Sequence, residues 1–228
     1  MKIKHIFKIF TALFITLIMY GCSPKPFVDS QNNFNPADAI LDTFNSQNPS
    51  VDCPAYRDLK IAEYFGHCIY YDNASIQVSP STNGNNIIVE YDLQPIYEWG
   101  NWFSIRRTTS APYDLSSYSG IKLRMRIVKP ADAILRITIA DIDPKTAPYA
   151  SDELWWCDFQ NLTTDPAGEW KILVCPFNSF TVSNGFGARQ NDQKLDLQNI
   201  IAFEISVLSR TKARINGSLE IDSLAAYK

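Results

Sequence analysis

Alternation between apolar and polar residues constrains the fold of this chain more than any other feature. In residues 121–127, isoleucine, leucine and methionine occupy every second position, with lysine and arginine between them. The same alternation occurs at 134–141, 201–207 and 219–222. A period of two places the apolar side chains on one face of an extended strand, so we expect half-buried β-strands. Turn-forming pairs such as Asn216-Gly217 separate the runs, and only residues 54–66 could hold a short helix. The pattern predicts an all-β fold, an antiparallel jelly-roll β-sandwich.

The first 22 residues have the layout of an export signal. Three lysines precede an apolar run over residues 9–20, and Gly21 stands directly before Cys22. This resembles the bacterial lipoprotein signal, in which the cysteine becomes the new N-terminus and carries lipid, so Cys22 is the predicted lipidation site. The apolar run is shorter than the roughly 20 residues of a membrane-spanning helix. Ser23 replaces the aspartate associated with inner-membrane retention, which predicts a lipid-anchored protein of the cell envelope, on the outer membrane. The alternative is an ordinary signal peptide with a cysteine there by chance.

Three regions follow from this interpretation. Residues 1–21 are the expected signal peptide, residues 22–38 the lipidated cysteine with a polar, proline-containing tether, and residues 39–228 one β-sandwich domain. Loss of the three lysines in residues 1–21 changes the net charge from −3 to −6. An acidic chain without a run of lysine or arginine is a poor partner for nucleic acid. Attachment to a membrane would therefore depend on the N-terminal lipid.

The other cysteines predict two disulfides, because an even number in an exported chain indicates pairing. They are Cys53, Cys68, Cys157 and Cys175. A hairpin folded about Pro166 places Cys157 opposite Cys175, Phe159 opposite Leu173 and Trp155 opposite Phe177. Cys53 then pairs with Cys68 by elimination. Zinc is the competing ligand, but the chain has no C-x-x-C motif and one histidine outside the signal, His67.

Four segments, in this order and spacing, resemble the galactose-binding-like β-sandwich of carbohydrate-binding modules from bacterial polysaccharide degraders. The segments are 114–124, 168–180, 195–203 and 219–224, and the resemblance covers about residues 39–228. It implies that Trp170 lies in the core. A related sandwich occurs in complex I intermediate-associated proteins, which assemble proteins and do not bind sugar, so the fold alone leaves two functions open.

Sugar binding requires flat aromatic rings that pack against the apolar faces of a pyranose, with polar groups at the rim. Tyr97, Trp99 and Trp102 place three large rings within six residues, in a loop that enters a strand. In that strand Trp102 and Arg106 have the parity opposite to the apolar residues, so we expect a ring beside a hydrogen-bond donor. Trp155 is assigned to the same site, since Trp155 and its neighbour Trp156 point to opposite faces and at most one of them is in the core.

Two further sets of charged residues are candidates for binding. Arg124 and Arg126 lie on the polar face of their strand, where a guanidinium can bridge sugar hydroxyls or pair with a carboxylate. The alternative is a solvated outer face. By resemblance to similar sandwiches, whose first and last strands lie side by side, Asp42 and Asp222 would hold a structural calcium ion. The alternative there is one exposed aspartate on each strand.

Catalysis has little support in the sequence. A serine or cysteine nucleophile needs a histidine base, and His67 lies beside a cysteine expected to be oxidised. No pair of carboxylates stands out by its spacing. We therefore expect a lipid-anchored, non-catalytic domain whose partner is a polysaccharide or oligosaccharide. The alternative is a structural lipoprotein that docks another envelope protein, which would present a broad apolar patch instead of a strip of rings.

Overall fold

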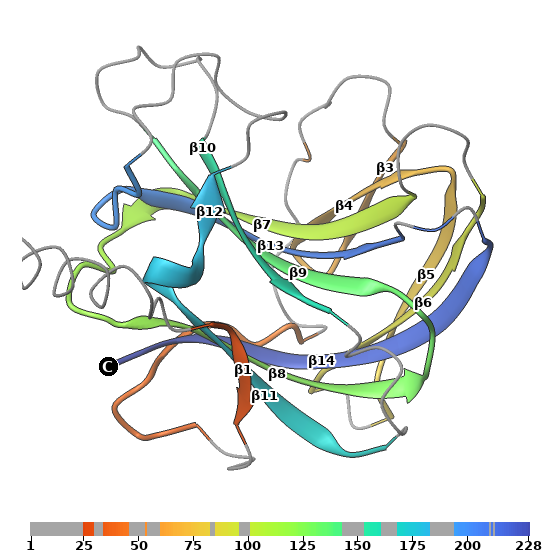
Figure 1. Ribbon diagram of the computed structural model, residues 1–228, viewed down its shortest axis with the longest axis horizontal. Coiled ribbons are helices and arrows are strands. Elements are labelled where there is room, and N and C mark those ends of the chain that lie inside the picture. Colours follow the sequence, from red (N-terminus) through yellow and green to blue (C-terminus); the bar gives the residue numbers. More distant parts are fainter. Residues whose placement is uncertain are drawn as a thin grey trace, which may run out of the picture.

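The computed structural model describes residues 25–29, 34–45, 53, 60–82, 85–95, 101–142, 153–160, 168–182, 194–209, 211 and 213–228. Two antiparallel sheets, A and B, pack face to face (Figure 1), which confirms the predicted antiparallel β-sandwich. The described residues form no α-helix, and their one helical element is the short 3-10 turn η2 (Phe177–Ser179). Part of the segment that could have held a helix is a strand, Lys60–Tyr64.

The two central strands of sheet A, Gly120–Lys129 (β8) and Ile215–Tyr227 (β14), make most of its contacts between strands. From one edge to the other its order is β1 (Phe27–Asp29), β11 (Trp170–Pro176), β8 (Gly120–Lys129), β14 (Ile215–Tyr227), β6 (Ile87–Leu93) and β5 (Ala74–Pro80). A further strand, β2 (Ala39–Asp42), pairs with the C-terminal part of β14, so the first strand of the predicted domain lies beside the last.

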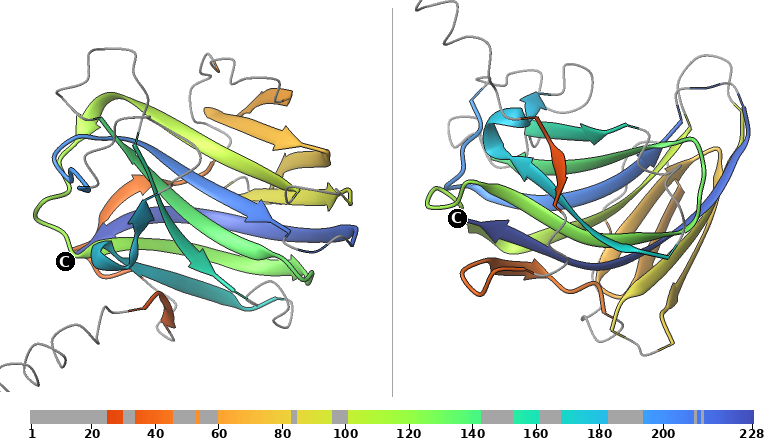
Figure 2. Two further views of the ribbon diagram at one scale, coloured as in Figure 1. Left: turned by 45° about the horizontal axis from the view of Figure 1, so that its top comes forward. Right: turned by 60° about the horizontal axis from the view of Figure 1, so that its bottom comes forward.

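Sheet B forms the second layer. Its order is β12 (Thr181–Val182), β10 (Glu153–Phe159), β9 (Ile134–Asp141), β13 (Ile200–Leu208), β7 (Trp102–Tyr113), β4 (His67–Asp72) and β3 (Lys60–Tyr64). Figure 2, left, is turned so that this sheet comes toward the viewer.

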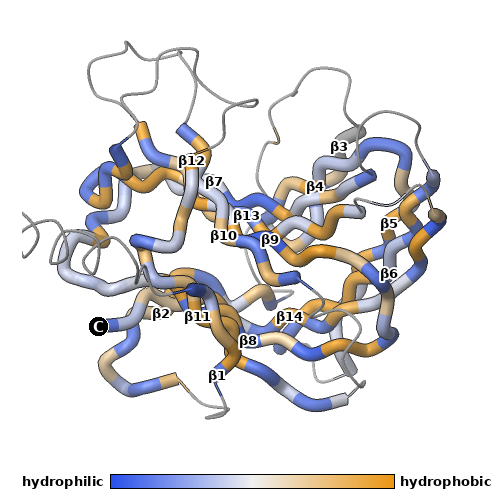
Figure 3. The backbone as a smooth tube through the Cα atoms, in the orientation of Figure 1, coloured by the Kyte–Doolittle hydropathy of each residue, from blue (hydrophilic) through white to orange (hydrophobic). Residues whose placement is uncertain are grey.

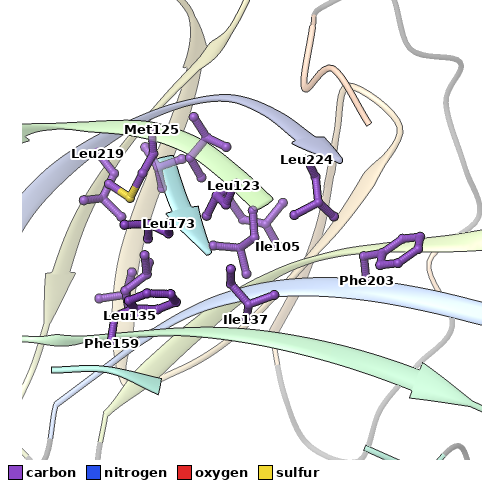
Figure 4. Close-up of a cluster of buried hydrophobic side chains, with 14 of the residues drawn as sticks. Ile105, Leu123, Met125, Leu135, Ile137, Phe159, Leu173, Phe203, Leu219 and Leu224 are labelled. Carbon is purple, nitrogen blue, oxygen red and sulfur yellow. The ribbon is translucent and has the colours of Figure 1, made fainter. Parts of the chain in front are cut away.

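The hydrophobic core lies between the two sheets and follows directly from the alternation in the sequence. Along β8 and β9, hydropathy changes from residue to residue (Figure 3). Leu123 and Met125 of sheet A meet Leu135 and Ile137 of sheet B, and all four are almost completely buried (Figure 4). Full burial of one such side chain contributes about 2 kcal/mol.

The disulfide between Cys157 and Cys175 crosses the core and joins the two sheets. The pairing is as predicted, but the hairpin used to derive it is wrong. β10 pairs with β9 and β12 in sheet B, whereas β11 pairs with β8 and β1 in sheet A. Both cysteines occupy inward positions of their strands, so they meet across the space between the sheets, with their Cα atoms 6.4 Å apart.

The hairpin partners predicted with that disulfide are corrected in the same way. Phe159 lies opposite Leu135 and Trp155 opposite Ile139, both within sheet B. The second predicted disulfide, Cys53–Cys68, is also present and fastens the segment before β3 to β4. Each loop of this length contributes about 3 kcal/mol in the chain-entropy model.

Part of the predicted tether is folded onto the sandwich. Phe27–Asp29 forms the edge strand β1, in register with Ile172–Val174 of β11. Further along, the nearly buried carboxylate of Asp38 accepts a hydrogen bond of 3.1 Å from Lys122 of β8. The folded unit therefore begins at least as early as Phe27. The described residues contain no helix long and apolar enough to cross a membrane.

Gly120, the first residue of β8, is required by close packing of backbone. A Cβ at this position would lie 2.3 Å from the carbonyl oxygen of Cys175 and 2.7 Å from Cα of Pro176. We expect Gly120→Ala to lower the free energy of unfolding by about 3 kcal/mol, because backbone atoms must move apart. Urea unfolding measures the effect, with the exposed turn variant Ser117→Ala as the control. Equal stability of the two variants would contradict this assignment.

Candidate functional site

The outer face of sheet B combines aromatic rings with a floor of small polar side chains. These residues alternate along their strands with core residues, so their side chains point away from the core, although the smaller ones, such as Thr138 and Ser206, are almost completely buried. The set comprises Trp156 of β10, Arg136 and Thr138 of β9, Glu204 and Ser206 of β13, Trp102, Ser104 and Arg106 of β7, and Tyr70 of β4.

Trp102 and Arg106 lie on this outer face, as the strand parity predicted. Phe103 and Ile105, which alternate with them, are almost completely buried in the core. Arg106 stands between Glu204 and Cys68 in the register of neighbouring strands, and its guanidinium lies 3.9 Å from the Glu204 carboxylate. The arrangement places a half-buried indole and a charge-balanced donor on one strand.

A second ring on the same face was missed from the sequence. The guanidinium of Arg136 stacks over Trp156, 3.8 Å from its ring centroid. It also donates two hydrogen bonds, of 2.6 and 2.8 Å, to the Asp158 carboxylate. Arg136 is thus held flat against the indole while its charge is balanced, which keeps the ring in a fixed orientation.

Trp155, the ring predicted to contact sugar, is instead a core residue. It is only 7% exposed, and its Nε1 donates to Asp141 at 3.3 Å. The reason is the alternation along β10, in which Cys157 points inward to its disulfide. Trp155, two residues earlier, must then point inward as well, and Trp156 outward. The disulfide was the signal that could have selected the correct tryptophan.

Trp102 and Trp156 stand at opposite corners of a polar floor. Three strand spacings separate β10 from β7, and Trp156 is in register with Arg106, four residues from Trp102. Strand geometry therefore separates the two rings by about 20 Å. The floor between them includes Ser206 and Thr138, which are nearly buried. Tyr97 and Trp99, the other predicted rings, lie outside the described residues.

Arg124 and Arg126 are on the other side of the sandwich, on the outer face of sheet A. Arg124 donates to Asp222 at 2.8 Å, and Arg126 pairs with Glu220. Both guanidinium groups also stack on Trp170, at 4.4 and 5.0 Å from its ring centroid. The structure therefore separates these arginines from Trp102 and Arg106.

Trp170 is consequently not a core residue, contrary to what the resemblance implied. It lies opposite Arg126 on the outward face of β11 and is partly exposed. The arginines cover the ring, which explains how a large apolar side chain is accommodated on an outer face.

Asp42 and Asp222 do not fit a shared calcium ion. The Oδ2 atom of Asp42 lies 2.7 Å from Nε2 of His67, and its Oδ1 accepts from the backbone N–H of Phe44 and from Arg107. Burial opposes ionisation of Asp42, but these partners hold the pKa of its carboxyl below the ordinary value.

Asp222 is the extra residue of a β-bulge in β14 and points to Arg124 on the outer face. Asp42, in register with the core residue Leu224, is on the inner face of the same sheet. In the described ranges no group of three or more histidine, cysteine or acidic side chains converges as metal ligands.

Asp141 and Glu153 form a buried pair of carboxyl groups at the end of sheet B. They lie directly opposite each other on β9 and β10, and both are almost completely buried. Burial raises the pKa of Asp141 to about 7, Glu153 adds to the increase, and a 2.6 Å hydrogen bond from the N–H of Asp196 opposes it. Asp141 thereby connects β9 to the segment that precedes β13.

Comparison with known proteins identifies the fold. No family model matches the chain, and no curated protein matches its sequence. Among solved structures, a family 11 carbohydrate-binding module from Clostridium thermocellum, in complex with a β-1,3-1,4-mixed-linked tetrasaccharide, is similar with a TM-score of 0.52 and 19% identity. The match covers 83% of this chain and 95% of that module. The chain shares the β-sandwich fold of this module.

A second solved structure, a family 30 carbohydrate-binding module, supports the same assignment. It is 12% identical, with a TM-score of 0.51, and the match covers 84% of this chain and 99% of the module. Sequence identity this low establishes the carbohydrate-binding-module fold and leaves the ligand to be argued from the residues of this chain.

The raised pKa of Asp141 predicts how stability depends on pH. Between about pH 4 and pH 7 the folded carboxyl holds a proton that the unfolded chain has released, so stability falls as pH rises through this range. Asp141→Asn does not titrate, and its single amide oxygen can accept from the N–H of Asp196 at the cost of the longer, 3.3 Å hydrogen bond from Nε1 of Trp155. We expect it to be more stable than the wild type at pH 8 by about 2 kcal/mol, with the advantage gone near pH 4.

Urea unfolding at pH 4, 6 and 8 tests this expectation, with the exposed variant Asp132→Asn as the control. If Asp141→Asn loses stability with rising pH as steeply as the wild type, titration of Asp141 in its pair with Glu153 is not the cause of the pH dependence.

Proposed function

We propose that this protein is a non-catalytic polysaccharide-binding domain whose ligand lies across the outer face of sheet B. The observation that carries the proposal is the pair of outward indoles, Trp102 and Trp156, at opposite corners of a polar floor. Trp102 offers an apolar surface for one sugar unit, and Trp156 offers the ring face that Arg136 does not cover. Their separation of about 20 Å suits a chain of several units better than a mono- or disaccharide.

The polar groups between the rings supply the hydrogen bonds. Arg106 is balanced by Glu204, and Arg136 by Asp158, so this face presents donors and acceptors without an excess of positive charge. An acidic polysaccharide would need unbalanced cations for its carboxylates or sulfates. The chemistry therefore favours a neutral glycan.

The similar solved structures support this proposal. The family 11 module has the same fold, and the ligand in its complex is a mixed-linked tetrasaccharide, a chain of several sugar units. A chain of that kind is what the spacing of Trp102 and Trp156 favours. Mixed-linked β-glucan is therefore the first ligand to test.

The alternative of a protein-docking lipoprotein receives less support from the distribution of exposed apolar side chains. Among the residues that the structure describes, the large ones with more than a third of their surface exposed are Phe27, Val28, Ile40, Tyr64, Tyr113, Val128 and Ile142. They come from different strands of both sheets, whereas docking would favour one contiguous apolar patch.

The two indoles provide the decisive test. Trp102→Ala and Trp156→Ala should each weaken binding to mixed-linked β-glucan about tenfold, because a stacked ring is worth about 1 kcal/mol or more. Trp170→Ala is the matched control, since it removes a partly exposed tryptophan stacked with arginine from the opposite sheet. Affinity gel electrophoresis with a panel of neutral polysaccharides measures binding, and circular dichroism melting measures folding.

The proposal would be wrong if both variants remain folded and bind as the wild type does. It would also be wrong if Trp170→Ala weakens binding to the same extent. If no polysaccharide in the panel slows the wild-type protein in the gel, the docking alternative is favoured.

We further propose that Cys22 carries lipid and holds the domain on the bacterial envelope, on the outer membrane. The support is the basic start, the short apolar run and the Gly21-Cys22 pair. In a bacterial host, Cys22→Ala should move the protein from the membrane fraction to the soluble fraction, and should abolish incorporation of labelled fatty acid. Cys53→Ala, which disrupts a disulfide, serves as the control. Unchanged membrane association of Cys22→Ala would remove this part of the proposal.

A further inference from the structure

The outer face of sheet A contains a depression of about 350 Å³ between β5, β6, β14 and the end of β8. Two adjacent cross-strand rows form its polar wall. One row runs Gln77, Glu90, Ser218 and the other runs Ser75, Asp92, Asn216. The volume is within the range of sites that hold small ligands.

The side chains of the first row make no hydrogen bonds to the residues that the structure describes. Ser218 is only 4% exposed, it lines the depression, and its Oγ has no hydrogen-bond partner. Within the part of the chain that the structure describes, Gln77 and Glu90 also make no side-chain hydrogen bond or ion pair. A buried hydroxyl without a partner is costly, and a ligand that supplies one would relieve that cost.

The rest of this face is different. Along β8, Lys122 pairs with Asp38, Arg124 with Asp222, and Arg126 with Glu220. The second row of the depression is also engaged, because Asp92 pairs with Arg214 and Asn216 accepts from Lys129. Within this depression, the polar side chains without a hydrogen-bond partner among the described residues therefore include those of the row Gln77, Glu90 and Ser218.

We propose that this depression is a second binding site, for a single neutral sugar unit, independent of the glycan face on sheet B. A carboxylate can accept hydrogen bonds from two neighbouring hydroxyls, which suits Glu90 to a vicinal diol. Gln77 and Ser218 on either side supply both donors and acceptors. Val128, which is 42% exposed and lines the same depression, offers an apolar contact for one face of the ring.

Nuclear magnetic resonance titration of the isotope-labelled protein tests the site, with glucose, galactose and xylose added separately as probes. Binding of at least one of them should shift the amide signals of Gln77, Gly217 and Ser218. Glu90→Ala and Gln77→Ala should each weaken that binding about tenfold or more, because each removes hydrogen bonds to the sugar. Glu169→Ala, which removes an exposed carboxylate elsewhere, should leave it unchanged.

Two results would overturn the proposal. One is the absence of amide shifts around the depression with all three sugars. The other is wild-type affinity in both Glu90→Ala and Gln77→Ala, which are positions whose replacement leaves the core intact. Trp102→Ala separates the two sites, because it should reduce polysaccharide binding and leave the monosaccharide shifts near Ser218 as they are.

Discussion

The structure depends on packing between the inner faces of two sheets in which inward and outward side chains alternate along most of each strand. Because each buried side chain fixes the orientation of its neighbours, the core determines which residues reach the two outer surfaces. The Cys157–Cys175 bridge fixes this relation further, since it joins the inner faces covalently. One residue of slip in β10 or β7 would bury Trp156 or Trp102 and expose a core side chain.

The two outer faces carry different sets of side chains. On sheet A, Lys122, Arg124 and Arg126 of β8 are each paired with a carboxylate. Ile172 and Val174, which lie opposite Arg124 and Lys122 on β11, are almost completely buried. Partly exposed ion pairs of this kind contribute little individually to stability, but they reduce the apolar area that this face presents to other molecules. On sheet B the cations are fewer and the rings are separated by small polar residues.

Much of the fold was predictable because it depends on local alternation. The strands around 121–127 and 134–141 and the outward parity of Trp102 and Arg106 follow from the side-chain period. Both disulfide pairings were predicted correctly, but the first came from a hairpin that does not exist and the second from elimination. Sheet membership did not follow, because a turn after β10 can lead either to a neighbouring strand or to the opposite sheet. That ambiguity gave the wrong hairpin, the wrong choice between Trp155 and Trp156, and the grouping of Arg124 with Trp102. The bulge at Asp222, which sends its carboxylate away from Asp42, has no signal in the sequence that we can identify.

If the protein is lipid-anchored, the edge strand β1 would limit the distance between the domain and the bilayer. If Cys22 carries lipid, the five residues from there to Phe27 span at most about 17 Å when fully extended. A free linker reaching to residue 38 would have allowed about three times that radius. The domain would therefore be held close to the membrane surface. A domain held this closely would reach only ligands near the bilayer surface.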